Sequence, residues 1–590
     1  MSFLPVTGPS NVPRSAPSDL VLDTMVDPWV RPSEWLDLNK PEGVPEKIIG
    51  LIAVYPDELK SISYLSFLCT TVTGGVDALT IDWGDGNIET VNSNSDVTHV
   101  YDYNDLPADT EFRGYRQARF ELTPTAVGDK FGSMIDFNKV GPISAAGNTV
   151  RWGSAILDMF ISTSNCTRIR MGTTYPPQLC EQIAIRNTPN NRLTTDYVTL
   201  YYYKRSLKSI PEVPYLTEGN KALNNVFIEC WSLEAIPDEF ANPDKNWFDE
   251  NTTSMSGAFQ SCHSLRYLPP GLFGNLPNCT DFYRTFRNCF ILEHIPYMGI
   301  STTVSEVRLR EMFLQCSRLK AIPQGFNISK VRGSQVLYGL YGTFNGCNSI
   351  QDWSPLNIEQ PETPLFDLSL AFMEYSSYFP NIAVFPYIGQ FSKVYDLFAT
   401  FQSKSMRRFS SQYTYLDFTN CTRLRQTFSA CYYLEELPPI HVSALSGVSS
   451  LYSTFQNCFQ LREVTIVGMT AGPSDGEYFR CFQSCYTLQK ISGIDWSYAN
   501  DGGDYSSTFS SCRNLAYIDF PGGPTDETGF KYSVILSYTR LDRDAILNIF
   551  NHLCTITHSA TIDLRNNSHT ADLTAADKLI ATNKGWTISL

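Results

Sequence analysis

Apolar residues recur at steps of three and four along much of the chain, and the stretch TFQNCFQLREV (454–464) is a compact example. In it a phenylalanine, a cysteine, a leucine and a valine follow one another three residues apart, and Leu451 precedes the phenylalanine by four. Such steps return side chains to one face of a helix. The valine belongs to the β-branched run VTIV, which is typical of a strand. We therefore expect a short helix that leads into a short strand.

This unit occurs eleven times between residues 201 and 535. Seven of the ten intervals between its phenylalanines are 27 or 28 residues long, and the others are 29, 31 and 32. In nine copies a cysteine follows three residues later, which gives the pairs Phe227/Cys230, Phe259/Cys262, Phe286/Cys289, Phe313/Cys316, Phe344/Cys347, Phe428/Cys431, Phe455/Cys458, Phe482/Cys485 and Phe509/Cys512. In the two remaining copies Phe372 is followed by Tyr375 and Phe401 by Lys404.

A unit of this length cannot bury its apolar face alone, so the copies are expected to stack. The repeats predict an α/β solenoid, a leucine-rich-repeat-like array of about 11 coils of about 27 residues. Each coil would supply one short helix and one short strand, and strands of successive coils would pair in parallel about 4.8 Å apart. The array then forms a rod or arc on the order of 50 Å long.

The recurring cysteine has three interpretations. As a packing residue it is small and apolar, and cysteine is among the most buried residue types. As a metal ligand it would be alone in its coil, and the chain has no C-x-x-C motif. Disulfides between neighbouring coils would fit the spacing but need an oxidising compartment. We interpret the cysteines as reduced core residues and expect neither a metal site nor a cofactor.

The unit AFQSCHSLRYLP (258–269) resembles the BspA-like leucine-rich repeat, whose mark is AFxxCxxLxxI. The resemblance extends over most of residues 201–535, and its longer form is common in bacterial surface proteins and phage proteins. Tyr375 and Lys404 depart from the mark, which puts the regular packing of their coils in question. Residues 536–590 end in ATNKGWTISL and resemble the C-terminal cap found after such repeats in phage proteins. A solenoid end needs a cover of this kind.

Three segments precede the repeats. Residues 1–45 contain eight prolines, which exclude helix and sheet and favour an extended arm that docks on a partner. Residues 46–125 alternate apolar and polar positions, as half-buried strands do. Residues 126–200 are expected to form a transition with an N-terminal cap of the solenoid, because NCTRIR (165–170) echoes NCTRLR (420–425).

The segment 46–125 carries the turn WGDG (83–86) and, further on, the triplet HVY (99–101). Together they resemble the PKD-like β-sandwich module, which implies a spacer or binding sandwich and not a catalyst. The turn residues singled out by this resemblance are Trp83, Asp85 and Gly86. Asp82 and Asp85 would together offer only part of a calcium site, and two carboxylates in a hairpin are far more often a tight turn.

Composition narrows the class of partner. The net charge is −15 and the pI is near 5.0, so no electrostatic attraction to nucleic acid or to an anionic membrane is expected. The N-terminus has no basic start followed by an apolar run, and no stretch approaches 18 apolar residues. We therefore expect neither a secretory signal nor membrane insertion. The apolar fraction of 43% excludes general disorder.

Motifs of catalysis are missing from the sequence. It has no HExxH, no G-x-x-x-x-G-K-[ST] and no G-x-G-x-x-G, and its seven histidines are scattered. Adjacent carboxylates such as Glu435 and Glu436 would point to opposite faces of a strand, unlike the pair of a glycosidase. We expect no enzymatic activity. A surface-degrading depolymerase stays an alternative and would require a cluster of carboxylates on one face.

Binding is the remaining class of function. Solenoids present a long surface whose side chains vary between repeats while the core stays constant. Aromatic residues make up 13% of the chain, and rings with polar tips suit glycans or protein partners. The candidates outside the repeat template that would face a ligand are Tyr267, Tyr432, Tyr433 and Tyr517. For each one, packing between coils is an equally good interpretation.

The stretches VRPSEWLDLNKPEG (30–43) and RGYRQA (113–118) resemble the front half of structural proteins of marine tailed phages. The resemblance implies a virion protein of the tail or a fibre, which attaches to other virion proteins through its N-terminal arm and to a host-surface glycan or protein through its repeats. Assembly of several copies stays open. The alternatives are a capsid decoration or head-fibre protein and a bacterial BspA-like surface adhesin.

Overall fold

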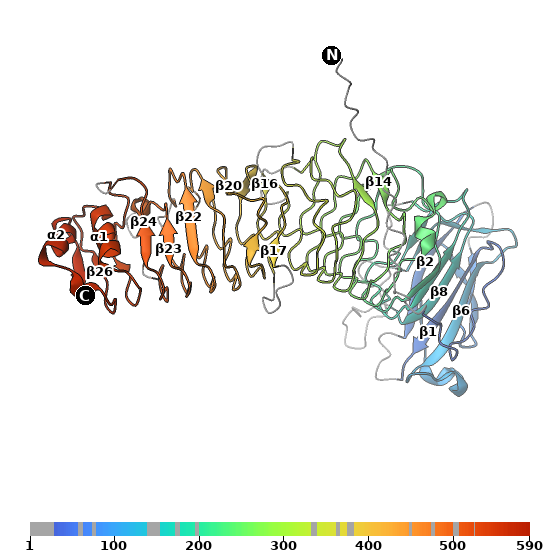
Figure 1. Ribbon diagram of the computed structural model, residues 1–590. Helices are drawn as coiled ribbons and strands as arrows, with labels where there is room; N and C mark the ends of the chain where they lie inside the picture. Colours follow the sequence, from blue (N-terminus) through green and yellow to red (C-terminus); the bar gives the residue numbers. More distant parts are fainter. Residues whose placement is uncertain are drawn as a thin grey trace, which may run out of the picture.

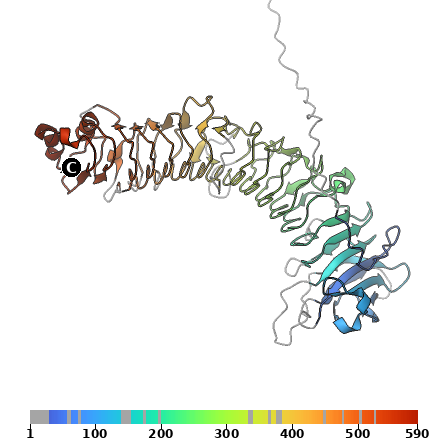
Figure 2. The ribbon, with the colours of Figure 1, turned by 60° about the horizontal axis from the view of Figure 1, so that its bottom comes forward.

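The computed structural model describes residues 29–56, 63–72, 78–137, 154–171, 177–194, 200–331, 339–361, 366–374, 383–445, 447, 451–473, 478–499, 505, 507–523 and 526–590. The molecule is elongated, with a sandwich of strands at one end, a long solenoid and a small cap that contains two helices at the other end (Figure 1). Viewed from below, the solenoid bends near the sandwich (Figure 2). Within the described part of the chain, neither helix has the length and apolar character that a bilayer crossing requires.

The N-terminal body consists of two sheets. One has the strand order β11-β10-β8-β1-β6-β3-β4, and the other has the order β5-β2-β7-β9. Their strands are β1 (Lys47–Val54), β2 (Tyr64–Val72), β3 (Ala78–Asp82), β4 (Ile88–Asn92), β5 (Asp96–Val100), β6 (Arg116–Pro124), β7 (Lys130–Asp136), β8 (Ile156–Ser162), β9 (Arg168–Arg170), β10 (Gln182–Arg186) and β11 (Ser209–Glu212). Apolar side chains such as Phe67, Trp83 and Phe137 fill the space between the sheets.

The larger sheet continues from the sandwich into the solenoid. Strand β8 pairs antiparallel with β1 on one side and parallel with β10 on the other, and β10 pairs parallel with β11. Strands β7 and β8, which lie beyond residue 125, thus belong to the two sheets of the sandwich. The change from antiparallel to parallel pairing at β8 is the point where the coiled arrangement begins, because parallel neighbours require a crossover between them.

Strands of the solenoid are short and follow one another along the rod (Figure 1). They are β12 (Lys221–Ala222), β13 (Thr252–Ser254), β14 (Gly274–Leu276), β15 (Met298–Ile300), β16 (Phe366–Asp367), β17 (Val384–Phe385), β18 (Val394–Asp396), β19 (Arg408–Phe409), β20 (Leu416–Phe418), β21 (Ile440–Val442), β22 (Glu463–Val467), β23 (Lys490–Ser492) and β24 (Tyr517–Asp519). All pairs between these strands are parallel, and β20 to β24 form one five-stranded sheet. The predicted solenoid is confirmed.

The short helix expected in each coil is wrong: the described residues around each repeat phenylalanine form consecutive turns, so the solenoid is a β-solenoid and not an α/β one. In the coil of Phe286, Arg284 and Asn288 both have left-handed backbone angles, with φ of 58° and 62°, which a right-handed helix excludes. The backbone N–H of Phe286 donates to Met312 O of the next coil at 2.9 Å, whereas that of Cys289 donates within its own coil. In this segment one backbone N–H group thus donates to the next coil and another donates within its own coil.

Coil spacing explains the difference. Packed helices lie 8–10 Å apart, whereas coils joined by strand pairs lie about 4.8 Å apart. Rings at the phenylalanine position follow this closer spacing, since their centroids are 5.1 to 6.2 Å apart and their planes differ by 21° or less. The stacked rings are Tyr201, Phe227, Phe259, Phe286, Phe313, Phe344, Phe372, Phe401, Phe428, Phe455, Phe482 and Phe509. A helix in every coil would be too wide for this stack.

The C-terminal cap closes the solenoid with β25 (Val534–Ile535), β26 (Thr561–Asp563), β27 (Thr587–Ser589), α1 (Arg543–His552) and α2 (Ala575–Asn583). Asp542 caps α1 through the backbone N–H of Ala545, and Thr574 forms a capping box at the start of α2. Short 3-10 helices occur at η2 (Tyr103–Asp105), η3 (Ala108–Thr110), η5 (Asp238–Ala241), η6 (Pro243–Lys245), η7 (Trp496–Tyr498) and η8 (Thr570–Asp572). The cap therefore contains three further parallel strands, with one helix before β26 and one before β27 in the sequence.

Candidate functional site

The repeat cysteines not only fill space in the core but also form hydrogen bonds between coils. Every repeat cysteine is buried and directs its thiol at the main chain of the preceding coil. Cys289 Sγ donates to Phe259 O at 3.1 Å, and Cys458 Sγ donates to Phe428 O at 3.1 Å. The same contact, at 2.9 to 3.1 Å, is made by Cys230, Cys262, Cys316, Cys347, Cys431, Cys485 and Cys512. The thiol thus links one coil to the next.

A threonine one residue before the phenylalanine makes a parallel link. Thr427 Oγ1 donates to Leu397 O at 2.9 Å, and Thr454 Oγ1 donates to Leu424 O at 2.9 Å. The acceptor is in each case the apolar residue four positions before the phenylalanine of the preceding coil. The sequence analysis missed this position, although a threonine recurs there in about half of the copies and was a readable signal.

Reactive chemistry is disfavoured at these thiols. Burial raises the pKa of Cys230 and of Cys512 to about 12, above the ordinary value of 9.0. The thiolate is the nucleophilic and metal-binding form, so these side chains are poor nucleophiles and poor ligands. All sixteen cysteines are free and buried, and the described residues contain no group of three or more potential metal ligands.

The coil that has a lysine in the cysteine position still packs regularly. Lys404 Nζ donates to Glu374 Oε1 at 2.6 Å, and both side chains are almost fully buried. Phe401 of this coil stacks on both neighbouring rings at 5.5 Å. The departure from the repeat mark is therefore accommodated by an internal ion pair. Tyr375, the other departure, lies outside the described residues.

A further coil precedes those read from the sequence. Tyr201 occupies the phenylalanine position and stacks on Phe227, and its carbonyl oxygen accepts from Cys230 Sγ at 2.9 Å. Lys204 occupies the cysteine position and donates to the carbonyl oxygen of Met171 at 2.8 Å. Burial lowers the pKa of Lys204 to about 8. This coil was missed because neither template residue matches the mark.

The sandwich turn is a closed structural unit. Trp83 stacks on His99 with ring centroids 4.4 Å apart, and His99 Nε2 lies 2.7 Å from Asp85 Oδ2. The other carboxylate oxygen of Asp85 accepts the backbone N–H of Asn87 at 3.0 Å. Gly86 has a φ of 95°, which favours glycine. Asp85 is thus engaged within the turn.

Exposed or half-buried rings directly follow six of the nine repeat cysteines, and we name these six residues the aromatic edge. Tyr432, Phe459 and Tyr486 stack in successive coils at 4.8 and 5.1 Å. Nearer the sandwich, Trp231, His263 and Phe290 stack at 5.3 and 5.0 Å. Arg205 of the preceding coil lies over Trp231, with its guanidinium carbon 4.1 Å from the ring centroid. Of these edge residues, Tyr432 is among the ligand-facing candidates predicted from the sequence.

The other predicted ligand-facing residues are dispersed. Tyr267 is half-buried, and its hydroxyl donates to Asp238 Oδ1 at 3.0 Å. Tyr433 is half-buried beside the edge, and Tyr517 is 37% exposed on β24 near the cap. The structure therefore places only Tyr432 and Tyr433 together.

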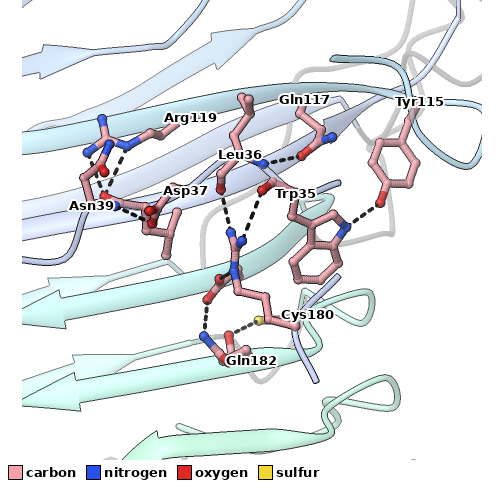
Figure 3. A network of polar contacts seen from close by, with 12 residues as sticks. Trp35, Leu36, Asp37, Asn39, Tyr115, Gln117, Arg119, Cys180 and Gln182 are labelled. Atoms are coloured by element: carbon pink, nitrogen blue, oxygen red, sulfur yellow. Dashed lines mark hydrogen bonds and ion pairs between the residues drawn. The ribbon is translucent and has the colours of Figure 1, made fainter. Parts of the chain in front are cut away.

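Residues 29–45 lie against the protein's own sandwich, and we name them the strap (Figure 3). Trp35 Nε1 donates to Tyr115 Oη at 3.0 Å, and the indole is buried on the outer face of the larger sheet. Arg31 Nε donates to the buried Asp158 Oδ2 at 2.7 Å. This part of the predicted docking arm thus contacts the chain itself; residues 1–28 lie outside the described residues.

Comparison with known proteins gave matches only among solved structures. No protein-family model matches the chain, and no curated protein sequence matches it. A solved structure to which the chain is similar is that of a leucine-rich repeat protein from Bacteroides ovatus ATCC 8483. The two are 14% identical, the match covers 70% of this chain and 95% of the other, and the TM-score is 0.27. The assignment as a β-solenoid accordingly rests on this chain's own strand pairing and stacked rings.

Proposed function

We propose that the protein is a structural component of a phage virion, in the tail or a fibre, and that it holds its solenoid outward for adhesion to the host surface. In this proposal it is a binding protein without catalytic activity. Its partners are other virion proteins at the N-terminal end and a glycan or protein of the host surface along the solenoid. The virion assignment is supported by the sequence resemblances of residues 30–43, 113–118 and 536–590.

The observation that carries the adhesive role is the contrast between neighbouring positions of the coil. Cys458 is buried and linked to the preceding coil, whereas Phe459, the next residue, lies in the stack of the aromatic edge. Trp231, Phe290 and Tyr486 are 36 to 43% exposed on this edge. Large rings at the surface are typical of sites that bind other molecules. The packed core leaves the edge free to differ from coil to coil.

The shape of the molecule fits a spacer that ends in a base. The sandwich and its strap form a folded body at one end, and the cap closes the other (Figure 1). A rod of this kind displays its long edge at a distance from whatever holds the base.

Two experiments test the proposal. Labelling purified particles with an antibody against the chain should mark the tail or a fibre; label on the capsid would favour the head-fibre alternative, and label on bacteria alone would favour the surface adhesin. Adsorption of the purified chain to host cells should fall at least several-fold in the double variant Trp231→Ala, Tyr486→Ala. Tyr538→Ala, which removes a 65% exposed ring from the cap, is the matched control and should adsorb normally. Equal adsorption by both would contradict the edge as the binding surface.

A further inference from the structure

A long groove crosses several coils, and its described lining includes none of the aromatic-edge residues. Its volume is about 1110 Å³, and its lining comes from Glu218 and from residues 240–243, 246–251, 271–277, 297, 299–303 and 325–327. The volume lies just above the range of about 300 to 1,000 Å³ that is typical of ligand-binding clefts. The groove was not predicted from the sequence.

Sequence features explain how the groove forms. The interval between Phe227 and Phe259 is 32 residues instead of 27, and the longer coil contains η5 and η6, which stand as one wall. The groove is deep at its glycines because these residues have no side chain that would fill it. A Cβ at Gly271 or Gly274 would meet nothing within 4 Å. The groove is therefore built by an insertion beside a run of glycines in successive coils.

Tyr297 provides a platform in the groove. Its side chain is 50% exposed, and its hydroxyl donates to Asn275 Oδ1 at 2.8 Å, which fixes the ring. One side of the ring lies against main chain, since a Cβ at Gly325 would meet its Cε2 at 2.8 Å. Rings of the aromatic edge cover one another's faces, but no other ring stacks on Tyr297 among the described residues. Its free face can receive the C–H face of a sugar ring.

Polar groups around the platform are amides and carboxylates. Asn242 Oδ1 accepts from Asp244 N at 3.0 Å, and Asn327 Oδ1 accepts from Ser329 N at 2.8 Å. Each amide oxygen is thus used inside the protein, and neither amide nitrogen donates to another described residue, so both can donate to a ligand. Glu218 and Glu250 add carboxylates that accept from hydroxyl groups. Uncharged polyols offer both the acceptors and the donors that this lining requires.

The charges of the groove lining disfavour an acidic ligand. Among the described lining residues there is no lysine, arginine or histidine, whereas Glu218, Asp249 and Glu250 are present. Asp249 is paired with Lys221 at 2.5 Å, and Glu218 Oε1 lies 3.4 Å from Arg192 Nη2, so Glu250 gives the described lining its negative sign. A phosphate, sulfate or carboxylate on the ligand would be repelled.

We infer that the groove binds an uncharged oligosaccharide, with one sugar ring on Tyr297 and its hydroxyl groups on the flanking amides and carboxylates. The inference deepens the proposed adhesive function and rests on it only for the expectation of a surface ligand. It names a second site, separate from the aromatic edge, and a ligand class for that site.

The test is binding of the full chain to immobilised oligosaccharides: neutral hexose and N-acetylhexosamine chains, and sulfated, sialylated and uronic-acid chains. We expect binding to neutral chains only. Tyr297→Ala should weaken it about tenfold, the loss expected for one aromatic stacking contact. Tyr297→Phe keeps the ring and should retain most of the binding. Tyr538→Ala, which removes a 65% exposed ring of the cap outside the groove, should change nothing, and a thermal melt of each variant checks that it is folded.

Several results would overturn the inference: no binding to any neutral chain, a preference for acidic chains, or neutral binding that Tyr297→Ala leaves intact. These outcomes are distinct from failure of the proposed function. If the protein adheres to cells through Trp231 and Tyr486 but does not bind oligosaccharides, only the groove site is contradicted. If the protein is absent from particles but still binds neutral oligosaccharides at Tyr297, only the virion assignment is contradicted.

Discussion

The sandwich and the solenoid satisfy their buried polar groups in opposite ways. In the sandwich the buried Asp158 accepts from Arg31, which is 127 residues away in sequence, and this contact is not part of a repeat. In the solenoid a thiol reaches the carbonyl group of a phenylalanine about 30 residues earlier, and the contact recurs from coil to coil. The sandwich therefore depends on single long-range contacts, whereas the solenoid divides its stability among equivalent ones.

Alkaline pH should separate the two regions most strongly. Burial raises the pKa of the repeat thiols, for example that of Cys230 to about 12 from 9.0. Their contribution to stability is complete below pH 9 and is lost as the pH rises toward the folded-state value, because only the unfolded thiols then ionise. At pH 10, ionisation of the unfolded thiol lowers the free energy of unfolding by about 1.4 kcal/mol for each repeat cysteine. For the nine repeat cysteines together the loss is on the order of 10 kcal/mol.

Urea-dependent proteolysis at pH 7.5 and pH 10, under reducing conditions, measures this loss in fragments of each region. The solenoid should become cleavable at much lower urea, and the sandwich, which holds Cys69, Cys166 and Cys180, should change less. Lys204 acts in the opposite direction between its folded pKa of about 8 and 10.5, since the unfolded chain then binds more protons. Equal stability of the solenoid at both pH values would contradict the burial of the thiols.

Lys404→Ala tests the coil in which an ion pair takes the place of the cysteine link. The change leaves Glu374 buried without its cation, and we expect a loss of about 4 kcal/mol in the local free energy of opening. Hydrogen exchange of peptides from residues 366–445 measures it. The double variant Lys404→Cys, Glu374→Ala restores the common pattern of the repeat and should recover most of the loss. If the local free energy of opening of Lys404→Ala lies within about 1 kcal/mol of the parent value, the ion pair does not stabilise the coil.

Trp35→Ala tests the dependence of the sandwich on its strap. The indole is buried among Tyr115 and apolar strand residues, and its removal should cost about 3 kcal/mol. The same exchange measurement should show faster exchange in residues 29–56 and 154–162 and no change near the cap. Trp231→Ala, which removes an exposed ring from the solenoid, is the control and should leave the sandwich unchanged. Loss of protection along the whole rod would mean that the two regions unfold as one unit.

Cys458→Ala should have the smallest of these effects, about 1 to 2 kcal/mol, because the neighbouring coils keep their own links. Cys458→Ser retains a donor for Phe428 O and should cost less than the alanine. Gln460→Ala, at an exposed position nearby, provides the baseline. Urea midpoints of the purified variants give the order. If serine is worse than alanine, the thiol serves packing alone and not the link to the carbonyl group.

The difference between the regions also explains what could be predicted from sequence. Repetition of Phe286 and Cys289 in every coil reveals a stacked core, because regular spacing is a local signal. The same spacing cannot distinguish a helix from consecutive turns, since both place steps of three and four on one side. Glycine and asparagine two residues from the phenylalanine, as at Gly257 and Asn288, were the available signal for left-handed turns.

Contacts that occur only once in the fold leave no periodic pattern in the sequence. Nothing in the sequence around Arg31 or Asp158 indicates that the two meet, and the strap was accordingly expected to reach a partner. The groove likewise depends on the insertion before Phe259 lying beside the glycines of later coils, which only the stacked arrangement brings together. The aromatic edge was readable in principle, because its rings follow directly after the cysteines, but the repeat template directed attention to the core positions.

The central claim is that the recurring thiols lie inside the stack and that recognition belongs to the surface. Titration of the native chain with a thiol reagent such as DTNB, before and after denaturation, tests this claim most directly. We predict that none of the sixteen buried cysteines reacts within minutes in the native protein and that all sixteen react once it is unfolded. Rapid reaction of several thiols in the native protein, or bound zinc released on their modification, would contradict the account.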